Sequence, residues 1–559
     1  MNKFKLFLPI IFAALLAIGI YVGMRLSEPF HNSNSFFSFR TGQFNKLNDV
    51  INYINQEYVD TVNQKKLVET TIGEMLHKLD PHSAYIPADE LQSSNEPLEG
   101  NFDGIGVEFH LEDDTIMVVT AISGGPSESL GIQPGDRIIE VDGKNVANIE
   151  ITNAQVMQSL RGPRGTKVKV TVYRKGKKID YTITRGKIPI YSVDVAYMLS
   201  KETGYIKVSH FGDKTYEEYV DGFMKLRDLG MKNLVLDLRG NPGGYLKTAI
   251  QLADEFLPEK KLIVYTQGRS RPKEVYSATT NGYFEKGALV VLIDEGSASA
   301  SEIVSGALQD WDRATIVGRR SFGKGLVQEQ SEFPDGSAIR LTIARYYTPT
   351  GRCIQKPYDG NYNDYENELS DRLKHGELLN SDSIHFPDSL KFTTPGGKIV
   401  YGGGGIMPDI FVSLDTSGSS QYFSDISSKG LITEYVYKYV DNNRTNLTSY
   451  KSFDEFNSSF KINETILNGF VAYAEKNGVK KDAVGLRTSD LIIKTQLKAL
   501  IARQVWKNDG FYPVIQSIDN TLKKALVRTQ PRSRALNPLR RRWRWRILSR
   551  TPLTIEYAL

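Results

Sequence analysis

The chain has 559 residues, so at about 100–200 residues per domain we expect three or four folding units. Apolar residues make up 40% and charged residues 24%, which excludes a collagenous, coiled-coil or wholly disordered protein. The net charge of +5 comes from the C-terminus, because residues 528–559 hold nine Arg and one Glu and the rest of the chain sums to −3. The composition of the body therefore gives no case for nucleic-acid binding. The single Cys353 excludes an internal disulfide and metal sites built on several thiolates.

The first element in chain order is an uncharged apolar run from Leu6 to Met24, which follows Lys3 and Lys5. The run has about the length of a membrane-spanning helix, and no clean Ala-x-Ala cleavage site follows it. The two lysines before it, against only Arg25 directly after it, place the N-terminus in the cytoplasm. We therefore expect residues 1–26 to form a signal anchor in the inner membrane, with the catalytic domains in the periplasm or extracytoplasmic space. A cleaved signal peptide is the alternative.

Residues 27–100 are predicted to form a tether and an N-terminal helical segment. Residues 27–45 are polar, and the apolar positions between residues 46 and 79 follow the period of a helix that Asp80-Pro81 ends. Residues 101–187 change to short strands with tight turns at Pro134-Gly135 and Asp142-Gly143, and thus predict a small β-rich domain.

Residues 188–415 alternate buried strands with helices and predict an α/β core. NLVLDL and ALVVLID are continuous apolar strands of the kind that is covered on both faces. Residues 358–391 are rich in Asp, Glu and Asn, and predict a polar surface insertion in this core. Residues 416–527 are again helical. The Arg-rich tail, residues 528–559, is interpreted either as a disordered or foreign C-terminus or as a basic arm for phosphates or anionic lipid.

The strongest local signal for chemistry is ALVVLIDEGSASASEI, in which an apolar strand ends at Asp294 and a helix begins near Ser299. A helix N-terminus presents free N–H groups and a partial positive charge, so a serine there can have an exposed hydroxyl beside a backbone donor. The alternative is that Ser297, Ser299 or Ser301 is only an N-cap.

A serine nucleophile needs a base, and the sequence offers two kinds. His210 is the histidine on the α/β core, whereas Lys324 lies between two glycines in SFGKGLVQEQ. A lysine becomes a base when burial lowers its pKa toward the working pH, and Gln328 could orient its amine. The alternative for the Gly-Lys-Gly stretch is an ordinary surface turn.

Taken together, these motifs resemble the carboxyl-terminal processing peptidases, also called tail-specific proteases. The resemblance covers roughly residues 45–415, and its motifs come in the family's order: LDPHS at 79–83, GIGV at 104–107, LRGPRGT at 160–166, DLRGNPGG at 237–244, SASASEI with FGKG, and GGIMPD at 404–409. It implies an α+β multidomain protein with a PDZ-like domain at 101–187 and a ClpP/crotonase-like serine peptidase core at 188–415.

By position, the resemblance makes Ser299 the nucleophile, Lys324 the general base and Gln328 the residue that orients it. The oxyanion hole would use the backbone N–H groups of Ala300 and Gly243. Asp310 would have a supporting role. No metal or cofactor is implied.

The resemblance also implies that the PDZ-like domain binds the C-terminal tails of protein substrates. Gly104, Ile105, Gly106 and Val107 would form the backbone nest for the terminal carboxylate. Arg161 would couple this domain to the core as a gate, or only cap a helix C-terminus. Two protomers would pair as a homodimer, as in similar peptidases. The alternative function is a catalytically silent PDZ scaffold or chaperone-like binder of the same tails.

Overall fold

The computed structural model describes residues 46–280 and 282–529. The chain divides into two compact units, Met1–Met75 and Leu76–Leu559. The predicted anchor at Leu6–Met24 and the tail from residue 530 lie outside the described residues. Among the described residues, no helix combines the length and the apolar character needed to cross a membrane.

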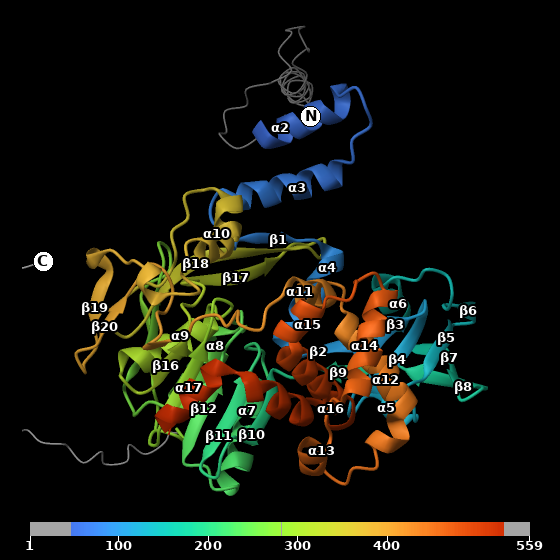
Figure 1. The fold of residues 1–559 in the computed structure, drawn as a ribbon. Coiled ribbons are helices and arrows are strands. Elements are labelled where there is room, and N and C mark those ends of the chain that lie inside the picture. Colours follow the sequence, from blue (N-terminus) through green and yellow to red (C-terminus); the bar gives the residue numbers. More distant parts are fainter. Residues whose placement is uncertain (1–45, 281, 530–559) are drawn as a thin grey trace, which may run out of the picture. The chain divides into compact units, whose positions relative to one another are not determined.

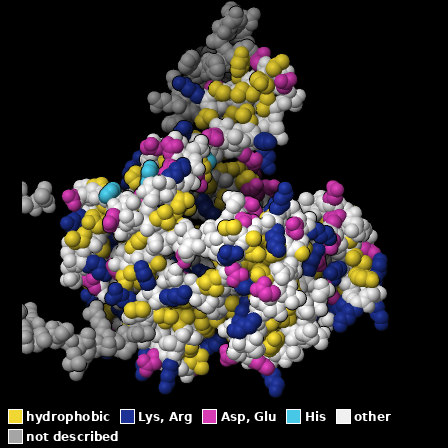
Figure 2. Space-filling model, viewed as in Figure 1, with side chains coloured by type: hydrophobic (Ala, Val, Ile, Leu, Met, Phe, Trp, Pro, Cys, Tyr) yellow, Lys and Arg dark blue, Asp and Glu magenta, His cyan; other side chains and the backbone are white. Residues whose placement is uncertain are grey.

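The first unit contains the beginning of the predicted helical segment. It holds α2 (Lys46–Glu57) and most of α3 (Gln64–His77), which ends in the second unit. None of the α2 side chains is buried, and Leu47, Val50 and Tyr53 are exposed. Apolar side chains accordingly gather on the surface of these two helices in Figure 2.

The predicted β-rich domain folds around a sheet in the order β3-β4-β5-β7-β8, with β6 paired to β5. Val118, Val156 and Val170 are fully buried in its core. β3 is an end strand of this sheet, so one of its edges is unpaired among the described strands. β2 and β9 form a separate antiparallel pair. Its elements are β2 (Asn101–Gly104), β3 (Val107–Glu112), β4 (Thr115–Ala121), α5 (Pro126–Ser129), β5 (Arg137–Val141), β6 (Lys144–Asn145), α6 (Asn153–Leu160), β7 (Lys167–Arg174), β8 (Lys177–Thr184) and β9 (Gly186–Pro189).

The α/β core is built on a six-stranded sheet in the order β10-β11-β12-β15-β16-β21, parallel from β11 onward. Side chains alternate between its faces: Leu236 and Val291 pack toward α7, α8 and α9, whereas Val235 and Val290 pack toward α17. α17 lies against strands β12, β15 and β16 (Figure 1). The two predicted apolar strands are therefore buried on both faces. The elements are β10 (Val193–Met198), β11 (Thr203–Val208), α7 (Thr215–Asp228), β12 (Asn233–Asp237), α8 (Leu246–Asp254), β15 (Leu289–Ile293), α9 (Ala300–Asp310), β16 (Thr315–Gly318), β21 (Ile410–Phe411) and α17 (Asn520–Thr529).

The core also contains a second sheet. Its strand order is β1-β18-β13-β14, and β17 pairs with β18. The predicted insertion contributes α10 and the start of the β19-β20 hairpin. It is not confined to the surface, because Tyr365 and Arg372 on α10 are buried. The elements are β1 (Ala84–Ile86), α4 (Ala88–Glu99), β13 (Leu262–Gln267), β14 (Glu274–Ser277), β17 (Leu326–Glu332), β18 (Ala338–Tyr347), α10 (Tyr362–Lys374), β19 (Lys391–Thr393) and β20 (Ile399–Tyr401).

The C-terminal helices form a core of their own, in which Phe456, Phe470 and Leu497 are fully buried. α12 also contacts the β-rich domain, where the Tyr437 ring stacks on His110 with 4.4 Å between ring centroids. The helices are α11 (Gln421–Ser428), α12 (Leu431–Leu447), α13 (Phe453–Ser459), α14 (Glu464–Lys476), α15 (Ala483–Thr488) and α16 (Asp490–Ile515).

Candidate active site

Ser299 lies at the turn between β15 and α9 in a backbone conformation that non-glycine residues rarely adopt. Its φ is 53° and its ψ is −111°. Such strain costs of order 1–3 kcal/mol and collects at functional sites. Ser297 and Ser301, in contrast, are buried and their hydroxyls donate to backbone carbonyls, those of Leu238 at 2.8 Å and Asn241 at 2.9 Å. Of the three serines, only Ser299 has a hydroxyl that donates no hydrogen bond among the described residues.

A buried carboxylate, that of Glu302, joins the start of α9 to the loop that carries Lys324. Its Oε2 accepts from the backbone N–H groups of Ser299 at 2.9 Å and Lys324 at 2.8 Å. Its Oε1 accepts from the Ser321 hydroxyl at 2.5 Å and the Gly323 N–H at 2.7 Å. Burial raises the pKa of Glu302, and these donors oppose the shift. Glu302 thus fixes the spacing of the two predicted catalytic residues. Its sequence signal was Ser-x-x-Glu, the capping-box pattern at a helix start.

Lys324 follows Gly323 in this loop and is largely shielded from solvent. Its amine forms no ion pair among the described residues. Burial is the main cause that lowers its pKa, and the Arg340 charge adds to this, whereas Asp80 and Glu302 oppose it. The Tyr346 hydroxyl donates to the backbone carbonyls of Ser299 at 3.0 Å and Lys324 at 2.5 Å, which ties the two residues together a second time.

Ser299 and Lys324 line the same cavity, whose volume is about 380 Å³. Apolar side chains such as Leu246, Ile303 and Leu326 line part of it, and polar side chains line the rest. The remaining lining residues are Asn95, Leu98, Glu99, Pro242, Gly244, Tyr245, Ala300, Val327, Gln328, Gln330, Arg340 and Tyr346. His210 is not among them, and burial lowers its pKa.

Gln328 also lines the cavity, and its amide is hydrogen-bonded to the LDPHS segment. Its Nε2 donates to the carbonyl of His82. The His82 Nε2 lies 2.9 Å from the Tyr365 hydroxyl of α10. That hydroxyl also accepts from Gln355 Nε2 at 3.3 Å, and the N–H of Gly325 donates to Gln355 Oε1 at 2.8 Å. Tyr365 is therefore connected to Gln328 through His82, and to the Gly325 N–H beside Lys324 through Gln355.

His82 is neutral in this arrangement. Burial lowers its pKa to about 3, and the charges of Lys324 and Lys356 act in the same direction. Neither His82 nor Tyr365 was predicted as a site residue. For His82 the available signal was its place in LDPHS, whereas Tyr365 lies in a segment whose composition indicated only surface.

The two predicted oxyanion donors differ in their present partners. The N–H of Ala300 has no acceptor among the described residues, whereas the N–H of Gly243 donates to Asn241 Oδ1 at 2.9 Å. Gly243 has a φ of 102°, and a Cβ there would lie 2.7 Å from the Ser299 Cβ, so only glycine fits. Gly244, the next residue, lines the cavity.

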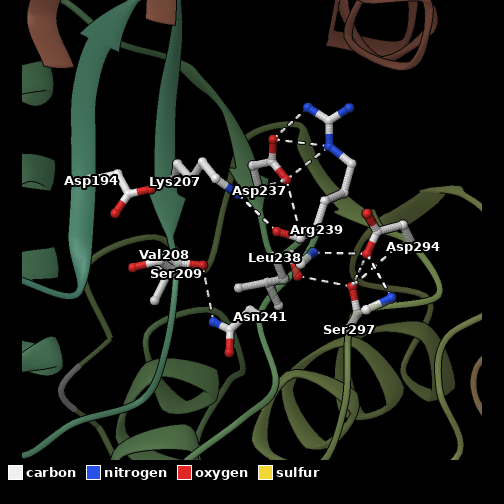
Figure 3. Close-up of polar contacts among 12 residues, drawn as sticks. Asp194, Lys207, Val208, Ser209, Asp237, Leu238, Arg239, Asn241, Asp294 and Ser297 are labelled. Carbon is white, nitrogen blue, oxygen red and sulfur yellow. Dashed lines mark hydrogen bonds and ion pairs between the residues drawn. The ribbon is translucent and has the colours of Figure 1, made fainter. Parts of the chain in front are cut away.

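The DLRGN segment before these glycines is held by a buried charge network (Figure 3). Asp237 is 1% exposed, and it accepts from Arg239 Nη2 at 2.6 Å and from the Tyr205 hydroxyl at 2.7 Å. Arg239 also pairs with Asp519, 2.7 Å away, between α16 and α17. The guanidinium and Lys207 hold the pKa of Asp237 well below its usual range, although burial opposes this. The DLRGNPGG motif is recognisable in the sequence, whereas this network is not.

The supporting residue Asp310 lies at the far end of α9 from Ser299. It is fully buried and pairs with Arg352 Nη2 at 2.7 Å. Its other oxygen accepts from the hydroxyls of Thr348 at 2.5 Å and Thr350 at 2.7 Å. Asp310 therefore anchors the end of α9 and does not contact the cavity.

Arg161 follows α6 of the β-rich domain and contacts α4, the helix that carries Asn95 and Leu98 of the cavity wall. Its Nη1 lies 2.7 Å from Glu96 Oε2, and its guanidinium lies 4.6 Å from the ring centroid of Phe102. Within the GIGV segment, the carbonyl of Ile105 accepts from the Ser127 N–H at 3.1 Å and hydroxyl at 2.6 Å. Gly104, Ile105 and Gly106 are buried, and Val107 is half-buried at the start of β3.

Four protein-family models match this chain. They are peptidase family S41 at residues 202–366, PDZ domain at residues 104–184, activating protease CtpB N-terminal domain at residues 14–90, and a family of unknown function at residues 422–507.

Two relatives and one solved structure are similar over much of the chain. The chain is 34% identical over 357 residues to the carboxy-terminal processing protease CtpA of Bacillus subtilis, which covers 64% of this chain and 76% of that protein. It is 38% identical over 320 residues to a carboxy-terminal-processing protease of Bartonella bacilliformis, covering 56% of this chain and 73% of that protein. The structure of a photosystem II D1 C-terminal processing protease is 26% identical and covers 65% of this chain and 84% of its own, with a TM-score of 0.33.

Proposed function

This chain belongs to peptidase family S41 as a carboxy-terminal processing serine protease, and from that premise we propose that Ser299 is its nucleophile and Lys324 its general base. The observation that carries this proposal is their shared cavity. There, among the described residues, the Ser299 hydroxyl donates to no acceptor and the Lys324 amine has no ion-pair partner. Glu302 holds the backbone N–H groups of both residues on one carboxylate oxygen.

In the acylation step, the neutral Lys324 amine takes the Ser299 proton while the Ser299 oxygen attacks the scissile carbonyl. The resulting oxyanion accepts a hydrogen bond from the Ala300 N–H. The second donor is the N–H of Gly243, which exchanges Asn241 Oδ1 for the oxyanion. Collapse of the tetrahedral species breaks the peptide C–N bond, and Lys324 returns its proton to the leaving amine. Water then attacks the acyl-enzyme while Lys324 takes a proton from it. The ester bond to the Ser299 oxygen breaks, Lys324 returns the proton to that oxygen, and the new carboxylic acid leaves.

Gln328 serves in this proposal as the residue that keeps the Lys324 amine pointed at Ser299. The His82 carbonyl fixes the amide nitrogen of Gln328, so the amide oxygen is left to accept from the lysine amine. Lys324 must be neutral at the start of each of the two steps, which agrees with the burial and the Arg340 charge that lower its pKa.

We further propose that the PDZ domain delivers unstructured C-terminal tails to this site. A tail would pair with the open edge of β3 and place its carboxylate at Gly104–Val107. The Arg161–Glu96 ion pair would couple the binding of the tail to the position of α4, and hence to the cavity wall. If Arg161→Gln cleaved a protein tail and a short peptide in the same ratio as the wild type, this coupling would be disproved.

The cellular setting is likewise a proposal. The uncharged run from Leu6 to Met24 supports anchoring in the inner membrane with the protease outside the cytoplasm. The exposed apolar side chains of α2 support pairing of two protomers. Alkaline extraction of membranes tests the anchor, and light scattering of residues 27–529 tests the dimer. Release by alkali, or a monomer at micromolar concentration, would oppose the respective proposal.

Mass spectrometry of a denatured protein substrate tests the proposed chemistry. The wild type should release fragments from the tail, and Ser299→Ala and Lys324→Ala should release none, while His210→Ala retains activity. Loss in His210→Ala with a normal rate in Lys324→Ala would instead identify a histidine base. Capture of the tail by the wild type without any fragment would favour the alternative, a catalytically silent PDZ scaffold or chaperone-like binder.

A further inference from the structure

Arg340 on β18 is a cationic residue of the cavity that contains Ser299. Its guanidinium donates only to neutral acceptors: Gln330 Oε1 at 3.1 Å, Asn95 Oδ1 at 2.7 Å and the Ser94 carbonyl at 3.4 Å. Its Nη1 has no acceptor in the part of the chain that the structure describes. The side chain therefore enters the cavity wall with its charge uncompensated.

Three other buried or half-buried arginines of the core are compensated by carboxylates. Arg239 pairs with Asp237 at 2.6 Å, Arg352 with Asp310 at 2.7 Å and Arg320 with Glu377 at 2.6 Å. Among the described residues, Arg313 is not compensated in this way, but its guanidinium donates to the backbone carbonyls of Phe256, Gly287 and Phe284 and does not line the cavity. Glu99 also lines the cavity, but it forms no ion pair with Arg340 within the described ranges. Burial lowers the pKa of Arg340, as expected where a guanidinium is desolvated without a carboxylate beside it.

The chemistry that matches such a site is a carboxylate, because guanidinium and carboxylate form paired, charge-assisted hydrogen bonds. We infer that Arg340 forms a carboxylate-binding subsite beside Ser299 that recognises a carboxylate of the peptide being cleaved. The inference rests on the proposed protease function and adds the chemical class that the cavity prefers.

Two parts of a peptide can supply that carboxylate. One is an Asp or Glu side chain close to the scissile bond, and the other is the terminal α-carboxylate of a tail cut near its end. The cavity of about 380 Å³ is at the small end of ligand sites, which commonly span roughly 300–1,000 Å³, so either group would lie only a few bonds from the reacting carbonyl.

Paired peptides distinguish the two sources. The first pair differs only by Glu or Gln beside the cut, and the second only by a free or amidated C-terminus. The measured quantity is the ratio of kcat/KM within each pair. In the wild type, at least one pair should favour the carboxylate by about ten-fold or more. The pair that does so identifies the source.

Variants of Arg340 test whether this residue causes the preference. Arg340→Gln should bring the ratio close to one, and Arg340→Lys should retain part of it. Arg345→Gln is the matched control, because Arg345 is exposed on the same strand and does not line the cavity. Any effect of the substitution on Lys324 basicity changes the rates of both peptides of a pair equally and therefore cancels in the ratio.

Equal rates within both pairs for the wild type would overturn the inference while leaving the protease function intact. An unchanged preference in Arg340→Gln would overturn it as well. If Arg340→Gln fails to fold, as judged by circular dichroism, the wild-type ratios together with the Arg340→Lys ratio still decide. If the wild type cut no peptide and was thus as inactive as Ser299→Ala, the proposed protease function would be rejected, and the subsite with it.

Discussion

At the scale of single residues, the site depends on how a few buried groups hold their neighbours. Ser299 has a strained backbone and a hydroxyl that donates to no acceptor among the described residues, although Ser297 and Ser301 are serines only two positions away. The difference comes from burial and from the acceptors each hydroxyl finds. Sequence spacing alone left the three serines open as helix caps, and the family resemblance selected Ser299.

Glu302→Gln should lower activity strongly although it removes no catalytic group. Both carboxylate oxygens of Glu302 accept hydrogen bonds, so an amide NH₂ would face donors on one side. We expect kcat to fall about a hundred-fold, as for loss of one oxyanion donor. The free energy of unfolding should fall by about 1–3 kcal/mol. Glu332→Gln, at an exposed position on β17, is the control. Wild-type kcat in Glu302→Gln would show that this carboxylate does not position the dyad.

Lys324→Met should be inactive and yet more stable than the wild type at neutral pH. Burial lowers the folded-state pKa of Lys324 below its ordinary value of 10.5. Between these two pKa values the unfolded chain binds more protons than the folded one, so wild-type stability rises with pH. The advantage of Lys324→Met should thus be largest below the folded-state pKa and shrink toward pH 10.5.

Urea-unfolding midpoints measured across this pH range test that expectation. Lys286→Met, at an exposed lysine of the same core, should show no such pH-dependent advantage. An advantage for Lys324→Met that stays constant or grows with pH would contradict a desolvated lysine.

At the scale of elements, α10 of the polar insertion supports the catalytic loop through Tyr365. Tyr365→Phe keeps the ring but loses the hydroxyl that contacts His82 and Gln355. We expect kcat to fall about ten-fold with little change in KM, since only about 1 kcal/mol of hydrogen bonding is lost. Tyr362→Phe on the same helix is the control. Equal kcat values for the two variants would show that the Tyr365 hydroxyl of the insertion does not support the catalytic loop.

The elements themselves were largely predictable, because local patterns encode them. Apolar runs of strand length predicted β12 and β15, and small residues before a helical stretch predicted the turn into α9. The same reasoning could not reveal the buried Tyr365, because a segment rich in Asp, Glu and Asn indicates only solvation. The ion pair between Arg239 and Asp519 could not be predicted either, because contacts between residues so distant in sequence leave no local pattern.

At the scale of the whole molecule, the C-terminal helices are part of the protease fold. α17 covers one face of the core sheet, with Leu522 and Ala525 packed against Val235 and Val290. Ending the chain at Asp519 should therefore expose this face and lower the unfolding free energy by several kcal/mol, at about 1.5–3 kcal/mol for each large apolar side chain.

Ending the chain at Thr529 instead removes only the Arg-rich tail and should leave both stability and proteolysis unchanged. Thermal unfolding and cleavage assays of the two truncations measure the difference. Equal midpoints would mean that α17 does not stabilise the sheet, and loss of activity in the longer form would assign a function to the tail.

The most direct measurement of the central claim is the rate of tail cleavage in Ser299→Ala, Lys324→Met and the variant that carries both changes. Residues that act as one catalytic unit are not additive, so removing either should cost as much as removing both. We predict the same residual rate in all three proteins, each at least a thousand-fold below the wild type. A Lys324→Met protein that cleaves at a substantial rate, or single losses that multiply in the double variant, would contradict the account.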